Sequence, residues 1–202
     1  MMSDDEHDFD IDPKSVQDKS VFMDKVDQSL YDARVHILHG ELTEFTCYES
    51  ARVLQSMGLK VSVEDPAQTI RIVLNSVGGG VFNGLLIFDT IAAIRRRGID
   101  VVVEVRGLAA SMAAILLQAG TKRVSSKYTR FMLHEVSDIA FGKTTEVEEQ
   151  AIELRKVNGM LAQILAARTG KSVEEIEQKM RKKDLWMSAA EALAFGLIDE
   201  VV

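Results

Sequence analysis

The sequence predicts an α/β fold with a mainly parallel sheet or stacked βαβ units. Two observations point to it. From residue 68 onward, short runs rich in Val, Ile and Leu alternate with longer segments whose apolar residues recur at helical spacing. The composition, 47% hydrophobic and 27% charged, is that of an ordinary globular protein, and 202 residues are enough for one sizeable domain.

The N-terminal segment is acidic and differs from the rest of the chain. Residues 1–12 hold six carboxylates and no Lys or Arg, within a chain of net charge -7. We expect residues 1–28 to form a mobile arm and residues 29–202 to form a single, nearly neutral domain. Such a domain gives no indication of a nucleic-acid-binding surface.

The first half of the domain is expected to begin with a strand at 33–40. Its alternation puts His36 and His39 on opposite faces, so the two make a poor metal-binding pair. The elements that follow are a helix at 45–58 ending at Gly58, a strand at 68–76, a glycine turn at 77–80, a helix at 81–98 ending in three arginines and Gly98, and a strand at 99–105.

The second half continues the alternation. We expect a helix at 111–119, strands at 121–125 and 129–136, a long helix at 145–170, a helix at 172–182 capped by Ser172, and within 188–202 a helix, Gly196 and a last strand.

Location is suggested by two further features. The single Cys47 cannot form an internal disulfide, which fits a reducing compartment. The N-terminus shows no secretory pattern, and no apolar run approaches the roughly 18–20 residues needed to span a bilayer. We therefore expect a cytoplasmic protein without a membrane partner, with an organelle matrix as the alternative.

Ser111 is a candidate nucleophile inside the small apolar run VRGLAASMAAILLQAG (105–120). It stands where a helix is expected to start, so unpaired backbone N–H groups and the positive end of the helix dipole would favour an oxyanion there. On this stretch alone, an N-cap serine is the simpler interpretation.

The glycine turn beside it, SVGGG (76–80), lies at the carboxyl end of a strand, where α/β folds place ligands. Its N–H groups could approach a phosphate, a thioester oxygen or a peptide carbonyl, although it lacks the lysine of a P-loop and the spacing of a dinucleotide site. A plain turn is the alternative, and Ser76 is a second candidate nucleophile.

His134 ends the strand RFMLHEV, where an imidazole could act as a general base, with a structural histidine as the alternative. A carboxylate would orient such a ring. Asp184, in KKDLWMSA, is one candidate, and sequence spacing does not separate it from its competitors Asp89, Asp138 and Asp199.

Taken together and in this order, these stretches resemble the ClpP family, the proteolytic subunits of self-compartmentalising serine peptidases. The resemblance runs from residue 29 to Val202. It is carried by VLNSVGGGVFNGLLIFDTI (73–91), by the A-A-S-M and M-L-H stretches, and by D-x-x-M-S-A-x-E-A-x-x-x-G-L-I-D near the C-terminus.

The resemblance implies a ClpP/crotonase-like fold with a protruding strand-helix handle at 137–170. It implies that Ser111 is the nucleophile, His134 the general base and Asp184 the carboxylate that orients it, with the backbone N–H groups of Gly79 and Met112 forming the oxyanion hole. No metal or nucleotide cofactor is implied for the peptidase itself.

The implied partners are unfolded polypeptide substrates, other copies of the chain in two stacked heptameric rings, and an AAA+ unfoldase that supplies the substrate. Two alternatives remain open: a non-catalytic or weakly active ring subunit, and a crotonase-type acyl-CoA enzyme that holds a thioester oxyanion at the glycine turn.

The chain departs from the family at several positions. Val77 and Val136 stand where relatives usually carry proline, which loosens the local backbone without removing a catalytic group. Asp138-Ile139 replace a glycine pair and Lys182-Lys183 an acid-Arg pair, so the handle packing and the contact between rings should differ. The acidic arm is also longer than usual and is a candidate for gating the axial pore.

Overall fold

The computed structural model describes residues 24–61, 69–137, 141–181 and 183–202. A helix at 24–32 precedes the sheet. The strands are β1 (Val35–Leu42), β2 (Ile70–Gly79), β3 (Val101–Ala110), β4 (Lys122–Ser125), β5 (Arg130–Leu133), β6 (Leu185–Ser188) and β7 (Glu200–Val201). The helices are α2 (Glu44–Lys60), α3 (Val81–Arg96), α4 (Met112–Leu116), the 3-10 turn η1 (Leu117–Ala119), α5 (Thr144–Thr169), α6 (Val173–Met180) and α7 (Ala189–Phe195).

The sheet is mainly parallel, as predicted. Its strand order is β1-β2-β3-β4-β7, and all of these neighbours pair in parallel. Strand β3 is long enough to pair with β4 along its first half and with β5 along its second half, and β6 adds to β5 as an antiparallel edge. The fold is therefore α/β, and β5 and β6 extend the sheet from the second half of β3.

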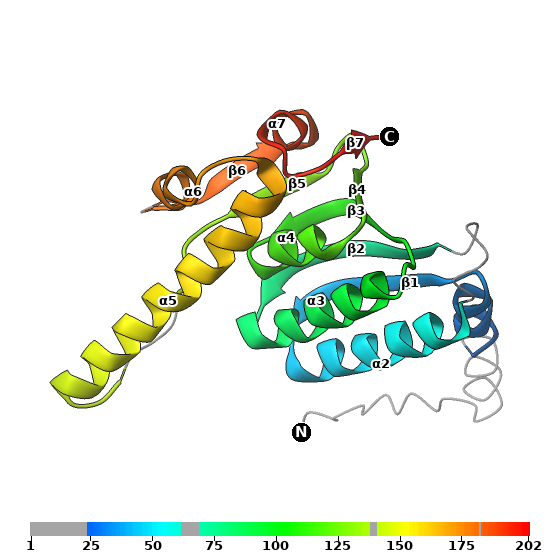
Figure 1. The fold of residues 1–202 in the computed structure, drawn as a ribbon, viewed down its shortest axis with the longest axis horizontal. Coiled ribbons are helices and arrows are strands. Elements are labelled where there is room, and N and C mark those ends of the chain that lie inside the picture. Colours follow the sequence, from blue (N-terminus) through cyan, green and yellow to red (C-terminus); the bar gives the residue numbers. More distant parts are fainter. Residues whose placement is uncertain (1–23, 62–68, 138–140, 182) are drawn as a thin grey trace, which may run out of the picture.

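Helices α2 and α3 lie side by side against the sheet, with α4 beside them, whereas α5 projects from the body as a long arm (Figure 1). The buried core joins these layers. Every second residue of β2 is buried, as are three alternate valines at the start of β3 and the isoleucines of α3 that recur at helical spacing: Ile70, Ile72, Leu74, Val101, Val103, Val105, Ile87, Ile91 and Ile94. The alternation in the sequence thus corresponds to real faces of the sheet and helices.

The arm helix α5 is buried only along its second half. Its buried residues are Val157, Leu161, Ala162 and Leu165, while the first half has none. Gly170 ends the helix in the left-handed conformation, with a φ of 73°, as glycine does at many helix ends. Of the predicted handle at 137–170, the helix is present, residues 138–140 lie outside the described residues, and no strand occurs at 141–143.

Several predicted boundaries are wrong, for one physical reason. The predicted turn at 77–80 is largely strand, because Gly78 and Gly79 pair in parallel with Glu41 and Leu42 of β1. Strand β3 likewise continues through Ala110, five residues beyond the predicted end. In both cases pairing with a neighbouring strand overrides the local preference of small residues for turns.

The other differences lie in the short strands and at the N-terminus. Strand β5 ends at Leu133, before the predicted end at 136, and β6 falls largely in a stretch, 183–187, to which no element was assigned. Of the predicted arm at 1–28, residues 1–23 lie outside the described residues and 24–28 are helical.

Candidate active site

Ser111 occupies a sharp turn between β3 and α4. Its φ is 54°, one of two positive values among the described non-glycine residues, and its ψ is -127°. Such a backbone is strained for an L-residue and persists only where the surroundings impose it. Here the Ser111 N–H donates to the carbonyl of Met132 on β5 at 2.8 Å, and its carbonyl accepts from Ala114 N–H at 3.0 Å. The turn is thereby locked from both sides.

The hydroxyl of Ser111 does not cap the helix. No side-chain capping bond is present at this residue, so the N-cap interpretation is wrong for its side chain. Instead Ser111 Oγ lies 2.8 Å from Nε2 of His134. An imidazole nitrogen at hydrogen-bond distance from a serine hydroxyl can accept its proton, so the two have the geometry of a nucleophile and a general base.

Parallel strand pairing explains why residues 23 positions apart meet. Ala110 at the end of β3 pairs with Met132 near the end of β5. Because parallel strands end at the same edge of a sheet, the residues that follow them emerge side by side. Ser111 follows β3 directly and His134 follows β5 directly.

Asp184 reaches the same place through antiparallel pairing. Leu133, the last residue of β5, pairs with Leu185, the first residue of β6, so the residue after one strand lies opposite the residue before the other. Asp184 Oδ1 is 3.8 Å from His134 Nδ1. This separation is within the range of an ion pair but is too long for a hydrogen bond. The Asp184 side chain is 53% exposed, so it has room to move toward the ring.

Of the three competing carboxylates, the two that the structure describes have other positions or partners. Asp199 is engaged by the guanidinium of Arg123, and Asp89 is an exposed residue of α3. Asp138 lies outside the described residues.

The two glycines at the end of β2 are required by close contacts. A Cβ on Gly78 would lie 2.7 Å from Ser111 Cβ and from the carbonyl oxygen of Ala110, and a Cβ on Gly79 would lie 2.6 Å from the carbonyl oxygen of Leu42. Their φ values of 93° and 151° also disfavour any other residue. The backbone of β2 can therefore lie directly against the Ser111 turn.

Ser76, the second candidate nucleophile, has a structural position. It is buried, and its Oγ donates to the carbonyl of Gly40 at 2.5 Å and accepts the N–H of Gly78 at 3.1 Å. Because both contacts are to the backbone, the hydroxyl supports the close approach of β1 and β2 and does not face the cavity.

A cavity of about 240 Å³ brings together four of the five predicted site residues, all but Asp184. Gly79, Ser111, Met112 and His134 all line it. Met112 is the first residue of α4, so its N–H has no acceptor within that helix. Two N–H-bearing residues, a hydroxyl and an imidazole therefore border one space, which suits an attacked carbonyl whose oxygen becomes negatively charged.

Apart from Ser137, the rest of the cavity wall is apolar, and it was not predicted. It comes from residues on several elements, among them the arm helix and α6: Val81, Ile115, Leu133, Val136, Leu161 and Met180. In the sequence, Leu161 and Met180 belong to ordinary apolar helix faces, so no local signal distinguishes them from core residues.

The described residues form neither a metal-binding cluster nor a membrane-spanning helix. Among the described parts of the chain, no group of three or more His, Cys, Asp or Glu side chains is placed to bind a metal ion. No helix in those parts is long and apolar enough to cross a bilayer.

The chain is similar in sequence to known proteins along most of its length. The model of the Clp protease family matches residues 18–202. An ATP-dependent Clp protease proteolytic subunit of Porphyromonas gingivalis is 35% identical over 196 residues, which cover 95% of this chain and 85% of that protein. An ATP-dependent Clp protease proteolytic subunit 2 of Chlamydia trachomatis is 39% identical over 171 residues, which cover 84% of this chain and 80% of that protein.

Proposed function

Because the chain belongs to the Clp protease family, we propose that it is a serine endopeptidase that hydrolyses peptide bonds of unfolded polypeptides with Ser111 as its nucleophile. The observation that carries the proposal is the 2.8 Å contact between Ser111 Oγ and His134 Nε2 beside an open cavity. This contact also argues against a non-catalytic ring subunit and against a crotonase-type acyl-CoA enzyme, neither of which needs an activated serine.

In the proposed mechanism, Ser111 Oγ attacks the scissile carbonyl carbon while His134 Nε2 takes the hydroxyl proton. The C–N bond then breaks as the imidazolium returns that proton to the leaving amine. Water attacks the acyl-enzyme by the reverse sequence, with His134 again accepting the proton. Both tetrahedral intermediates carry their negative charge on the former carbonyl oxygen.

The backbone N–H groups of Gly79 and Met112 are proposed to hold that oxygen. Each such donor contributes on the order of 10²–10³ in kcat in related chemistry. Asp184 is proposed to accept a hydrogen bond from the Nδ1–H of His134 and, remaining ionised, to stabilise the imidazolium. For this, the 3.8 Å separation must shorten to about 3 Å when substrate binds, a tightening common in catalytic sites.

We further propose that the cavity takes an apolar substrate side chain next to the scissile bond. Its wall is formed mainly by Ile115, Leu133, Leu161 and other apolar residues, and no Asp, Glu, Lys or Arg side chain lines it. A charged side chain in this position would lose its hydration without a partner, which is unfavourable.

The proposed assembly is a chamber of two stacked heptameric rings in the cytoplasm, supplied with substrate by an ATP-driven unfoldase. Both relatives are named as subunits of an ATP-dependent protease. In the isolated chain, Phe82, Tyr128 and Phe141 are 72%, 85% and 86% exposed, a state of aromatic side chains that is typical of surfaces covered by a partner. The proposed chemistry uses no cofactor.

A fluorophosphonate probe tests the nucleophile. We expect the wild-type protein to be labelled at Ser111, and Ser111→Ala to lose both labelling and cleavage of an unfolded substrate because the attacking oxygen is gone. Ser56→Ala is the control, since it removes an exposed hydroxyl on α2 that bonds to Tyr31. Cleavage that persists unchanged in Ser111→Ala would contradict the proposal.

A further inference from the structure

We propose that Asn158 on α5 is a positioning residue for catalysis, which fixes the segment after His134 by accepting the backbone N–H of Val136. The two groups are joined by a hydrogen bond of 2.8 Å between Val136 N and Asn158 Oδ1, across 22 residues of sequence. The inference rests on the proposed role of His134 as general base.

The segment that carries His134 has left the sheet. Strand β5 ends at Leu133, and its last pair with β6 is Leu133 with Leu185. Residues 134–137 belong to no helix or strand. The ladder that holds β5 in place therefore stops one residue before the imidazole, and attachment beyond that point depends on other contacts.

The same segment forms part of the cavity. His134, Val136 and Ser137 all line it. A shift of this backbone would move the imidazole relative to Ser111 Oγ and would change the shape of the cavity at the same time. Because a displacement of about 1 Å can cost on the order of a hundredfold in rate, the attachment point of Val136 matters for chemistry.

Asn158 is well placed to supply that attachment. It is half-buried in the packed half of α5, where its neighbour Val157 is buried and Leu161, one turn later, lines the cavity. Asparagine is a poor helix former, less favourable than alanine by roughly 0.7 kcal/mol in a helix interior, so helix stability does not explain its presence. Its amide oxygen instead satisfies a partly buried donor.

Residue 136 is a valine and therefore has a backbone N–H to donate. A proline there would restrict its own φ and would carry no N–H. Val136 has both a free φ and a donor, and the donor is used to bond α5. The hydrogen bond to Asn158 thus supplies a restraint that the covalent structure of valine does not provide.

The test uses the full-length assembled protein and compares Asn158→Ala with Gln163→Ala, which removes an exposed amide from the same helix. We expect Asn158→Ala to lower kcat for an unstructured peptide, and the rate of fluorophosphonate labelling, by about ten- to a hundredfold with little change in KM. The native mass should be unchanged, and the melting temperature should fall only slightly, because the higher helix propensity of alanine partly offsets the lost hydrogen bond. Asn158→Asp, which keeps an acceptor, should retain more activity than Asn158→Ala.

Val136→Pro provides the decisive comparison, since it removes the donor. In that background Asn158→Ala should have no further effect on the labelling rate. Amide exchange adds a readout that does not depend on activity: the Val136 N–H should exchange faster in Asn158→Ala than in the wild type.

Each outcome is informative. Labelling of Asn158→Ala at the wild-type rate overturns the positioning role and leaves the proposed function intact. An equal loss in the Val136→Pro and wild-type backgrounds also overturns it, because Asn158 would then act through another contact. Absence of Ser111 labelling in the wild type overturns the proposed function, and the positioning role with it.

Discussion

At the scale of single residues, the site depends on glycines and on the small side chain of Ser111. Ser111 can hold a φ of 54° beside β2 only because Gly78 leaves space for its Cβ. Gly84 of α3 likewise leaves space for Met112, the residue after Ser111, since a Cβ on Gly84 would lie 2.4 Å from Met112 Cγ. The glycines around the turn are therefore explained by packing against it as much as by their own flexibility.

His36 gives a prediction for stability against pH. Burial lowers its pKa from the usual 6.5 to about 4, and its Nε2 has no hydrogen-bond partner among the described residues. Between these two values the unfolded chain binds more protons than the folded one, so stability is full above pH 6.5 and decreases as the pH falls. We expect the free energy of unfolding to drop by about 2 kcal/mol from about pH 7 to about pH 5.

Denaturant unfolding of variants at the two pH values checks this. His36→Leu should lose most of the drop, because no group is left to titrate. His39→Gln should keep it, since His39 is an exposed residue of the same strand. A drop of unchanged size in His36→Leu would show that another group is responsible.

At the scale of elements, one antiparallel pair of short strands determines the geometry of His134 and Asp184. Strands β5 and β6 each have four residues, and their register places the two site residues at the same end. A slip of one residue would reverse the face of every side chain in β6. The buried contacts of Phe131 and Met187, which are paired in this register, oppose such a slip.

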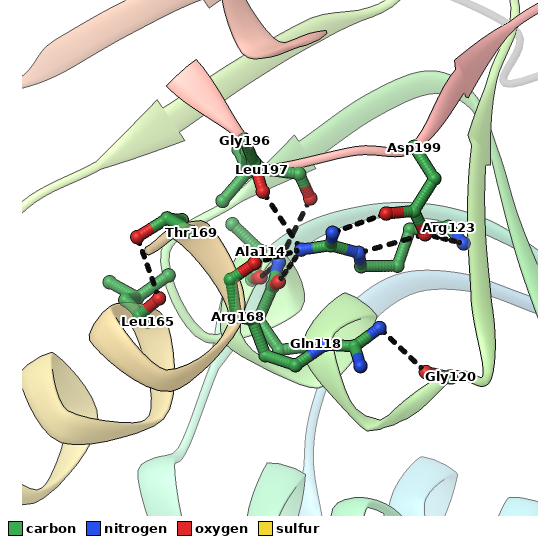
Figure 2. A network of polar contacts seen from close by, with 10 residues as sticks. All are labelled: Ala114, Gln118, Gly120, Arg123, Leu165, Arg168, Thr169, Gly196, Leu197 and Asp199. Atoms are coloured by element: carbon green, nitrogen blue, oxygen red, sulfur yellow. Dashed lines mark hydrogen bonds and ion pairs between the residues drawn. The ribbon is translucent and has the colours of Figure 1, made fainter. Parts of the chain in front are cut away.

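A buried arginine joins η1, α5 and the segment between α7 and β7. Arg123 on β4 bonds Gln118 of η1, the carbonyl of Arg168 on α5, the carbonyl of Gly196 after α7 and the carboxylate of Asp199 (Figure 2). Arg123 is only 6% exposed in its side chain. Burial raises the pKa of Asp199, but its hydrogen bonds with Arg123 outweigh burial and hold that pKa below its ordinary value.

We expect Asp199→Ala to lower the free energy of unfolding by about 3–5 kcal/mol, because it leaves the buried guanidinium without a counterion. Glu200→Ala is the matched control. It removes the adjacent residue, whose exposed ion pair with Lys122 should contribute less than about 1 kcal/mol. Denaturant unfolding near neutral pH measures both, and equal small losses would show that the network does not hold the C-terminal elements.

At the scale of the whole molecule, the isolated chain exposes surfaces that suit assembly. No residue in the first half of α5 is buried against the rest of the same chain, and Phe141, just before the helix, is 86% exposed. A long helix without a packing partner is rarely stable by itself in water. Among the described elements, the projecting helix α5 in Figure 1 is thus the one that packing against a second copy of the chain would stabilise most.

Native mass spectrometry tests the proposed assembly. We expect a mass near fourteen times 22.4 kDa for the wild type. Phe141→Glu should shift the mass toward seven protomers, because in the proposed two-ring assembly a charge would then be buried between the arms of the two rings. A stable wild-type monomer that cleaves unfolded substrate at full rate would contradict the chamber.

The long elements and the fold class could be predicted from the sequence. Helices α2, α3 and α5 fall within a few residues of their predicted bounds, since amphipathic periodicity over four or more turns is a strong signal. Strand β6 was missed because four residues carry too little periodicity to separate strand from turn. The end of β2 was predicted as a turn because three successive glycines favour one locally, and only β1 makes it a strand.

By itself, the sequence determined an alternation of strands and helices, the acidic start of the chain and a short set of candidate residues. The tertiary structure decided among them. It directed Ser76 to the backbone and Ser111 to His134, and it brought Asp184 rather than Asp199 near the imidazole. The physical reason is that hydrophobic periodicity depends on residues close together in the sequence and can be seen in it directly. The proximity of residues far apart in the sequence depends instead on the register of paired strands, which forms only in the folded protein.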